Sequence, residues 1–452
     1  MTWNKKEAID PLSPFAETYD ASTHLDKTAR TESVRSERAF LVGVFTEGMP
    51  VTDEELEELE GLAKAAGTTV VGRLTQKRPK PDFTTYLGRG KVDELKEFLT
   101  PLDVDVVIFD NDLGPAQARN LEKELKVKVI DRTELILDIF VSRAKTREAR
   151  LAVELAQLEY SLPRLKQMWT HLERQFGGGV GTQRGAGEKQ LEMDRRIAQK
   201  RIAELKVQLQ EIHERRKREV ASRKKSRSAC LVGYTNAGKS TLLNTLTHSD
   251  VFAKDLLFAT LDTRTRRWQL PGWGPVLLSD TVGFIRDLPH HLIASFRATL
   301  EEANEADVLI HVADASHPDV EAQIASAFRV LEDVGIEHKD TVLVLNKTDQ
   351  VQPPEKLDRL MNLYPQAISI SAKTGDGLDK LTLAVSDVLS REFRCLEVVM
   401  PVSNGRLAAY LAKEGEILSR IYDGEKAIFQ CRVPQYVHGQ LEKEPDVTAR
   451  EM

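Results

Sequence analysis

The chain has 452 residues, enough for about three domains, and 41% of them are hydrophobic, as in an ordinary globular protein. Its net charge of −6 gives no overall sign of nucleic-acid binding, and its three cysteines are too far apart for a metal site or a disulfide framework. No stretch reaches the ~20 apolar residues of a membrane span, and the N-terminus lacks the apolar core of a signal peptide. We therefore expect a cytoplasmic protein.

The first part of the chain predicts a small domain preceded by a tail. Residues 1–37 are polar and aperiodic, which predicts a flexible tail. Residues 38–142 alternate apolar runs with helical stretches, as in an α/β domain with a mostly parallel sheet. We expect strands at 39–45, 68–74, 104–110 and 127–131, and helices from Thr52 (a capping box with Glu55), at 91–99 and at 115–125.

Residues 143–227 have a different pattern. Leucines from Leu151 to Leu172 recur at spacings of 4, 3, 4, 3 and 7, and a second apolar seam runs from Leu191 to Ile212. Both seams fit heptads, so we expect two long helices in an antiparallel hairpin, joined by a glycine-rich loop at 177–187. Pro163 lies inside the first helix and is expected to kink or divide it.

Two further units complete the expected fold. Residues 228–393 alternate strands and helices again, and residues 394–452 predict a few strands, one helix near 404–413 and a tail. The expected fold class is α/β: a small parallel-sheet domain, an antiparallel helical hairpin, a Ras-like phosphate-loop domain and a small C-terminal α/β unit.

The strongest single motif is Gly233-Tyr-Thr-Asn-Ala-Gly-Lys-Ser240, between the apolar run ACLV and the helical pattern TLLNTL. This strand–loop–helix context is the one that a phosphate-binding loop requires, because its backbone N–H groups and a helix N-terminus face the phosphates. Lys239 is expected to reach the β- and γ-phosphates, and the Ser240 hydroxyl to bind Mg²⁺. The alternative is a chance glycine-rich turn.

Three motifs in the expected order argue against that alternative. Asp280-Thr-Val-Gly283 ends one apolar strand, where the carboxylate can hold Mg²⁺ and the glycine N–H can contact the γ-phosphate. Asn346-Lys-Thr-Asp349 ends another, and the Asp349 carboxylate can accept from guanine N1–H and its 2-amino group. Ser371-Ala-Lys373 can offer backbone N–H groups to guanine O6. Each alone could be a solvated loop, but together they predict a GTP site at the carboxyl ends of strands.

The loop 258–265 is the expected source of a threonine that closes over Mg²⁺ and the γ-phosphate. We expect Thr260, with Thr263 and Thr265 as competitors. The expected catalytic residues are Lys239, Thr260 and Gly283, and the expected Mg²⁺ ligands are Ser240, Thr260 and Asp280. The expected nucleotide-binding residues are Gly233, Tyr234, Thr235, Asn236, Ala237, Gly238, Lys239, Ser240, Thr241, Phe258, Ala259, Thr260, Leu261, Asp262, Asp280, Thr281, Val282, Gly283, Asn346, Lys347, Thr348, Asp349, Ser371, Ala372 and Lys373.

Phe284 stands where many GTPases have a glutamine that orients the attacking water. Phenylalanine cannot hydrogen-bond water, so intrinsic hydrolysis is expected to be slow until a partner or a cation completes the site. Asn236 is one candidate for holding such a cation, K⁺, between the phosphates. A plain turn asparagine explains that position equally well.

The motifs GYTNAGKS, FATLD, DTVGF, NKTD and SAK, preceded by a helical hairpin and an α/β domain, resemble the HflX family. The segments YLGRGKVDEL (86–95) and FGGGVGTQRGAGEKQLE (176–192) are similar to signatures of that family, and the resemblance covers about residues 39–440. It implies a GTPase that binds the large ribosomal (50S) subunit and separates stalled or hibernating ribosomes. It also implies that the C-terminal unit contacts proteins near the factor-binding region.

The predicted hairpin is basic. Between Arg143 and Ser228 there are 22 Lys/Arg and 11 Asp/Glu, a net charge of +11, which leaves −17 for the rest of the chain. A solvated, salt-bridged face is one explanation, but the excess and the runs RRKR and RKK favour ribosomal RNA, with no role for DNA. The expected RNA-binding residues are Arg174, Gly177, Gly178, Gly179, Arg184 and Lys189, and we expect a monomer.

Two other functions fit less well. A GTPase that regulates ribosome assembly or an RNA-modifying enzyme would share the nucleotide motifs, but the α/β domain shows no Cys/His cluster or nucleophile motif. A non-catalytic binding module conflicts with the intact Lys239, Ser240 and Asp280.

Overall fold

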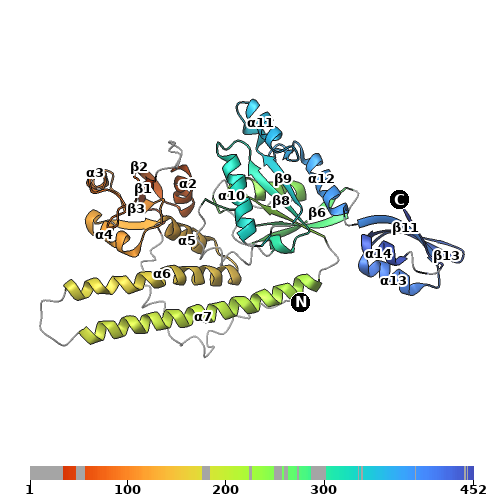
Figure 1. The fold of residues 1–452 in the computed structure, drawn as a ribbon, viewed down its shortest axis with the longest axis horizontal. Helices are drawn as coiled ribbons and strands as arrows, with labels where there is room; N and C mark the ends of the chain where they lie inside the picture. Colours follow the sequence, from red (N-terminus) through yellow and green to blue (C-terminus); the bar gives the residue numbers. More distant parts are fainter. Residues whose placement is uncertain are drawn as a thin grey trace, which may run out of the picture.

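The structure is a computed structural model. It describes residues 34–46, 56–175, 184–222, 227–248, 257–258, 263–271, 274–286, 302–333, 335–336, 339–391, 393–441, 444 and 446–452. For 165–175, 184–191, 216–222 and 435–436 it describes the backbone alone. Three sheets and a long helical hairpin lie in chain order, with the C-terminal sheet at the far end from the N-terminal domain (Figure 1).

The N-terminal domain has a four-stranded sheet in the order β2-β1-β3-β4, and all three neighbouring pairs are parallel. Its elements are β1 (Arg38–Phe45), α2 (Glu57–Ala66), β2 (Thr69–Lys77), α3 (Arg89–Leu99), β3 (Val106–Phe109), α4 (Pro115–Leu125), β4 (Lys128–Asp131) and α5 (Arg132–Arg143). The β1 side chains alternate between two cores, since Leu41 packs with α2 and α5 and Val42 with α3 and α4. The predicted parallel α/β domain is confirmed.

Two details of this domain differ from the prediction. Helix α5 was not predicted, because its apolar residues are buried on nearly all sides and show little helical periodicity. Val34, assigned to the tail, is buried in the domain core. The predicted capping box at Thr52 and Glu55 lies outside the described residues.

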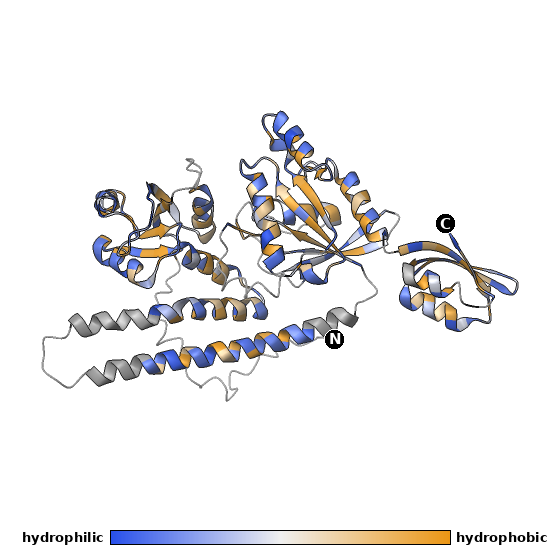
Figure 2. Ribbon diagram, viewed as in Figure 1, coloured by the Kyte–Doolittle hydropathy of each residue, from blue (hydrophilic) through white to orange (hydrophobic). Residues whose placement is uncertain are grey.

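The hairpin consists of α6 (Arg147–Gln175) and α7 (Arg184–Ser222). Leu151, Leu155 and Leu205 form its buried seam, as the heptads predicted, and Figure 2 shows hydrophobic and hydrophilic residues alternating along the coloured parts of both helices. The prediction that Pro163 could divide the first helix is wrong: α6 is a single element. The ion pairs Arg201–Glu154 (2.7 Å) and Lys206–Glu159 (2.8 Å) connect α6 to α7 before Pro163, and the helix continues past the hydrogen bond that this proline cannot donate.

The third unit has a six-stranded sheet in the order β10-β9-β8-β5-β7-β6, in which only β6 runs antiparallel to its neighbour. Its elements are β5 (Ser228–Val232), α8 (Lys239–Thr247), β6 (Arg264–Leu270), β7 (Gly274–Asp280), β8 (Val308–Asp314), α10 (Val320–Asp333), β9 (Thr341–Asn346), the 3₁₀ turn η1 (Thr348–Gln350), α11 (Glu355–Leu363), β10 (Ile368–Ser369) and α12 (Leu378–Ser390). α8 and α12 pack on one face. Part of the other face shares a core with the N-terminal domain.

The C-terminal unit is an antiparallel sheet in the order β12-β13-β11-β14 with α13 and α14 packed against it. Its elements are β11 (Phe393–Pro401), α13 (Gly405–Glu414), β12 (Glu416–Asp423), β13 (Lys426–Pro434), α14 (Gln435–Leu441) and β14 (Thr448–Glu451). Among the residues that the structure describes, no helix is long and apolar enough to cross a membrane.

Candidate functional site

The phosphate loop joins β5 to α8, and its backbone conformation restricts which residues it can contain. Gly233 and Gly238 have φ of 140° and 94°, and Asn236 has φ of 61°. A Cβ atom on Gly233 would lie 2.1 Å from the carbonyl oxygen of Val312, so that position accepts only glycine. The loop therefore forms a backbone cradle that ends at the N-terminus of α8, a favourable place for an anion.

The Lys239 ammonium group is fixed by hydrogen bonds within the phosphate loop. Its Nζ donates to the carbonyl oxygens of Gly233 (2.9 Å) and Tyr234 (2.7 Å). Burial lowers the pKa of Lys239 to about 8, so an anionic ligand would stabilise its charge. The buried Thr235 Oγ1 has no hydrogen-bond partner among the described residues, which fits a ligand in the cradle.

The residues expected to hold Mg²⁺ meet at the end of β7. The Ser240 hydroxyl donates to Asp280 Oδ2 at 2.6 Å, and Asp280 is fully buried. A hydroxyl and a carboxylate are oxygen ligands of the kind that Mg²⁺ prefers, so the pair fits this ion. In the described part of the chain no three His, Cys, Asp or Glu side chains cluster in a way that could hold a metal. Mg²⁺ in nucleotide sites commonly takes its remaining ligands from phosphate oxygens and water.

The base-binding motifs meet beyond the ends of β9 and β10. Asn346 links them to the phosphate loop, since its Nδ2 donates to the Ala237 carbonyl (2.8 Å) and its Oδ1 accepts from the Ala372 N–H (2.9 Å). The Ser371 hydroxyl donates to Asp349 Oδ1 at 2.7 Å, which fixes that carboxylate. Lys347 pairs with Asp314 at 2.7 Å. Asp349 is exposed and thus open to a base.

The threonine competitors for the Mg²⁺ site have other partners. Thr265 lies in β6, where its hydroxyl hydrogen-bonds that of Ser279 at 2.8 Å, and Thr263 Oγ1 donates to Glu302 at 2.9 Å. Thr260 lies outside the described residues, together with Ala259, Leu261 and Asp262. Phe258 is buried, and its ring lies edge-on to Phe140 of α5 at 4.7 Å, so its side chain contacts the N-terminal domain.

The segment after β7 lies directly against the phosphate loop. The Phe284 N–H donates to the Gly233 carbonyl (3.0 Å), and the Thr235 N–H donates to the Phe284 carbonyl (2.7 Å). Phe284 itself is 3% exposed and belongs to the core shared with the N-terminal domain. The ring that replaces the usual glutamine is therefore part of the contact between domains and does not face the phosphates.

Gly283→Ala is expected to lower single-turnover GTP hydrolysis about 10²- to 10³-fold, as when one transition-state hydrogen-bond donor is lost. A Cβ at this position would lie 2.7 Å from Thr235 Cα, so the segment has to leave the phosphate loop. A fluorescent-GDP titration should show nearly unchanged affinity. Gly405→Ala is the control, because nothing lies within 4 Å of its Cβ position. Hydrolysis by Gly283→Ala at the wild-type rate would refute this role.

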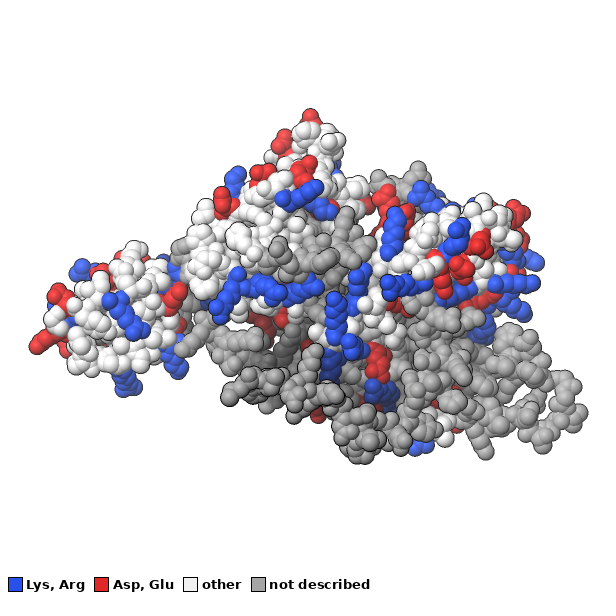
Figure 3. Space-filling view, turned by 180° about the vertical axis from the view of Figure 1, so that it is seen from behind, with Lys and Arg blue, Asp and Glu red and all other residues white. Residues whose placement is uncertain are grey.

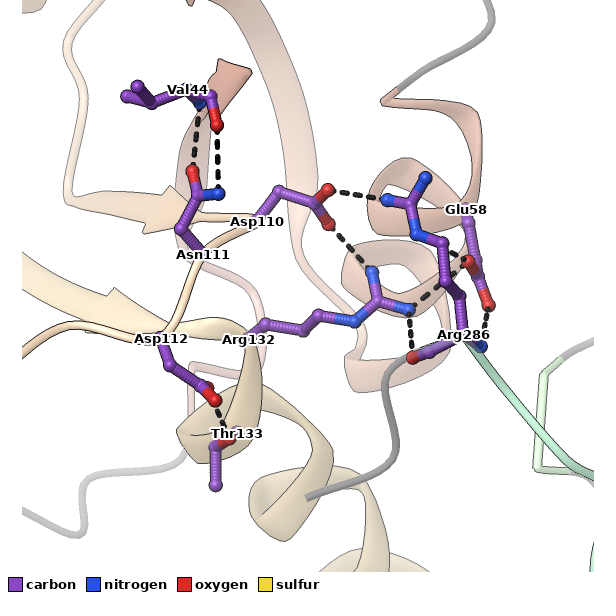
Figure 4. A network of polar contacts seen from close by, with 8 residues as sticks. All are labelled: Val44, Glu58, Asp110, Asn111, Asp112, Arg132, Thr133 and Arg286. Atoms are coloured by element: carbon purple, nitrogen blue, oxygen red, sulfur yellow. Dashed lines mark hydrogen bonds and ion pairs between the residues drawn. The ribbon is translucent and has the colours of Figure 1, made fainter. Parts of the chain in front are cut away.

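Arg286, two residues after Phe284, is held by charged groups of the N-terminal domain (Figure 4). Its guanidinium pairs with Asp110 at 2.6 Å, and its backbone N–H donates to Glu58 at 3.2 Å. Arg132 pairs with the same two carboxylates, at 2.6 and 3.1 Å, and donates to the Arg286 carbonyl at 3.2 Å. Burial opposes the charge of Arg132, but Glu58 and Asp110 outweigh it and raise the pKa of this group.

Sequence analysis did not identify Glu58, Asp110, Arg132 or Arg286. They lie up to 228 residues apart and belong to no motif, so a single sequence gives no signal that they meet.

Asp110→Ala is expected to destabilise the N-terminal domain by about 3–5 kcal/mol, because it leaves the buried Arg132 without its closest counter-charge. Thermal melting of the full chain measures this loss. Asp93→Ala is the matched control, since Asp93 is 65% exposed and its ion pair with Lys96, at 3.6 Å, is a weak surface contact. Equal melting temperatures for the two variants would contradict the structural role of Asp110.

The predicted RNA-binding residues belong to the hairpin tip and its two flanking helix ends. Gly177, Gly178 and Gly179 lie outside the described residues, and for Arg174, Arg184 and Lys189 only the helix backbone is described. Arg184 begins α7, so the last four residues of the predicted glycine-rich loop form a helical turn.

Comparisons with known proteins agree with the arrangement of the site. Profiles of three families match consecutive parts of the chain: a GTP-binding GTPase N-terminal family over 53–141, a GTP-binding GTPase middle region over 143–223, and a 50S ribosome-binding GTPase family over 228–347. The GTPase HflX of Lacrimispora saccharolytica is 42% identical over 414 residues, covering 91% of this chain and 96% of the relative.

Other relatives give the same result. The GTPase HflX of Alkalihalophilus pseudofirmus is 45% identical, covering 83% of this chain and 89% of its own. That of Escherichia coli is 44% identical, covering 82% and 87%. With these identities and a complete phosphate loop, the chain belongs to the HflX family of ribosome-associated GTPases and hydrolyses GTP.

Proposed function

We propose that this GTPase binds the large ribosomal subunit and separates stalled or hibernating ribosomes into subunits, with the basic hairpin as its main RNA-binding element. Its substrate is GTP. The phosphate loop and Lys239 would hold the phosphates, Asp349 the guanine base, and Ser240 and Asp280 the Mg²⁺ ion. When bound, Mg²⁺ supplies positive charge against the phosphates in the transition state.

One observation carries the proposal: two adjacent residues connect the hairpin to the nucleotide site. Asp131 accepts from Arg164 (2.7 Å) and from Tyr160 (2.7 Å), both on α6 of the hairpin. The next residue, Arg132, holds Arg286 through Asp110 and through a direct hydrogen bond. Arg286 lies three residues after Gly283, the expected contact of the γ-phosphate. Through these contacts, a movement of the segment at the γ-phosphate would change the position of α6 relative to the nucleotide site.

A splitting assay tests this function. Intact ribosomes are incubated with the full chain and a non-hydrolysable GTP analogue, and separated subunits are quantified on a sucrose gradient. We expect subunits to appear with the analogue and not with GDP. Ribosomes that stay intact under both conditions would remove the splitting activity from the proposal.

Asn236→Gly is expected to abolish any stimulation of GTP hydrolysis by K⁺ relative to Na⁺. The left-handed φ of 61° explains an asparagine on conformational grounds alone, and glycine tolerates the same backbone. The substitution therefore keeps the backbone conformation and removes the side chain whose carbonyl would hold a cation between the phosphates. Hydrolysis rates in KCl and NaCl, with and without ribosomes, make the comparison. Stimulation by K⁺ that persists in Asn236→Gly would assign the asparagine to the turn alone.

A further inference from the structure

Phe83 is the most exposed large hydrophobic side chain in the described part of the chain, with 98% of its surface accessible. It lies between β2 and α3 of the N-terminal domain, at the tip of a short loop far from the nucleotide site in sequence. An isolated exposed apolar residue needs no explanation. A fully exposed aromatic ring on a hydrogen-bonded loop, in a positively charged segment, does need an explanation.

The loop is fixed by hydrogen bonds on both sides of Phe83. Asp82 and Tyr86 form a backbone bridge, with both hydrogen bonds at 3.0 Å. The Asp82 carboxylate accepts from the Thr84 N–H at 2.8 Å, which lowers its pKa. Two side chains of α4 donate to the loop backbone. Gln117 donates to the Asp82 carbonyl and Asn120 to the Thr84 carbonyl, both at 2.9 Å. The ring is therefore presented by an ordered backbone.

The surroundings of Phe83 are basic. Residues 77–91 contain five Lys or Arg and one Asp, a net charge of +4 in a chain that carries −6 overall. Of these five cations, Lys91 pairs with Glu94 at 2.8 Å and Arg78 lies 4.0 Å from Asp82, whose carboxylate also accepts from the loop backbone. The other three, Lys77, Lys80 and Arg89, are exposed. Figure 3 shows Lys and Arg side chains intermixed with Asp and Glu over the visible face of the N-terminal domain, on the right of the view.

We propose that Phe83 is a stacking platform for an unpaired RNA base, and that Lys77, Lys80 and Arg89 contact the neighbouring phosphates. An aromatic face offers any base a π surface, and cations around it hold the backbone, which is how proteins bind unstacked RNA. The inference rests on the proposed ribosome binding, to which it adds a second RNA contact, distinct from the hairpin. A hydrophobic pocket on a protein is the competing partner, but it would gain nothing from the surrounding positive charge.

Three substitutions of Phe83 separate a base from a protein pocket. Phe83→Ala removes the ring, Phe83→Leu keeps an apolar side chain without a π face, and Phe83→Trp enlarges the π face. Stacking predicts that Trp binds as tightly as Phe or tighter and that Leu is as weak as Ala. An apolar pocket shaped for Phe predicts the reverse, because Leu would fit and Trp would not. Since Phe83 is almost fully exposed, none of the variants should change thermal stability.

The full-length variants are tested by fluorescence anisotropy with labelled single-stranded oligouridylate and oligoadenylate of about twelve nucleotides. We expect Phe83→Ala and Phe83→Leu to weaken binding about 5- to 150-fold, the value of one stacked base. Lys80→Glu should weaken it and reduce the salt dependence of log K by about one phosphate contact. Tyr422 is the control, because it is an aromatic side chain that is 62% exposed on the C-terminal sheet, and Tyr422→Ala should have no effect.

Co-sedimentation of the same variants with large ribosomal subunits separates this inference from the proposed function. Wild type that does not sediment with subunits would overturn the proposed function. Wild type that binds subunits and oligonucleotides, with all three Phe83 variants equal to it, would overturn the stacking platform alone. Subunit binding that survives in Phe83→Leu and is lost in Phe83→Trp would replace the base with an apolar protein pocket.

Discussion

Asp349→Asn is expected to reduce GTP affinity about 10²- to 10⁴-fold and to create affinity for xanthosine triphosphate. The carboxylate would accept from guanine N1–H and from the 2-amino group, and two charge-assisted hydrogen bonds of this kind are worth about 3–6 kcal/mol. An asparagine can still accept from N1–H through its carbonyl oxygen, but its amide NH₂ then faces the 2-amino donor of guanine, whereas it can donate to the 2-oxo group of xanthine. The Ser371 hydroxyl that now donates to Asp349 can bond either side chain, so the loop should keep its shape.

Titration with fluorescent GTP and XTP analogues measures both changes. Asp376→Asn is the matched control: it removes one negative charge from a nearby loop, where the side chain accepts only from Thr374 in the described contacts (2.8 Å). It should leave GTP affinity within about threefold, as is usual for exposed substitutions. An Asp349→Asn variant that binds GTP like wild type and ignores XTP would show that the base-site assignment is wrong.

Replacement of residues 177–187 by a tight turn is expected to abolish ribosome splitting and to leave basal GTP hydrolysis intact. Six of these eleven residues are glycine, and the segment joins two long helices of a basic hairpin. Backbone N–H groups and the adjacent arginines would contact folded RNA. All the phosphate- and base-binding motifs follow Ser228, so the nucleotide pocket does not need the loop.

The two activities are measured on the same protein, hydrolysis without ribosomes and splitting on sucrose gradients. Lengthening the segment by two glycines serves as the control, because it keeps the helices and preserves the contacts expected of the loop. A shortened chain that splits ribosomes at the wild-type rate would make this segment a mere connection between the helices.

The parts of the molecule with local signals could be predicted from the sequence. Strands β1, β3 and β4 follow apolar runs, the hairpin follows its leucine spacing, and the phosphate loop follows a motif whose glycines have positive φ. These signals lie in consecutive residues, so one sequence is enough. The sequence shows Phe284 in the place of a glutamine, but it does not predict where the ring lies. Its burial against the N-terminal domain depends on how two domains dock.

What could not be predicted depends on contacts between distant segments. Glu58, Asp110, Arg132 and Arg286 come from four separate segments, and each looks like an ordinary surface charge in the sequence. Helix α5 was missed because burial on nearly all sides removes the amphipathic pattern by which helices are recognised. Pro163 predicted a kink or a division of the first helix, and only the division is contradicted, since α6 continues through this residue as one helix.

Co-sedimentation with purified ribosomal subunits tests the central claim most directly. The full chain is mixed with large or small subunits in the presence of a non-hydrolysable GTP analogue or GDP, and the pelleted fraction is measured at two salt concentrations. We predict that the chain pellets with large subunits in the presence of the GTP analogue, less so with GDP or at higher salt, and not with small subunits. A chain that stays in the supernatant with large subunits, whichever nucleotide is bound, would contradict the proposal.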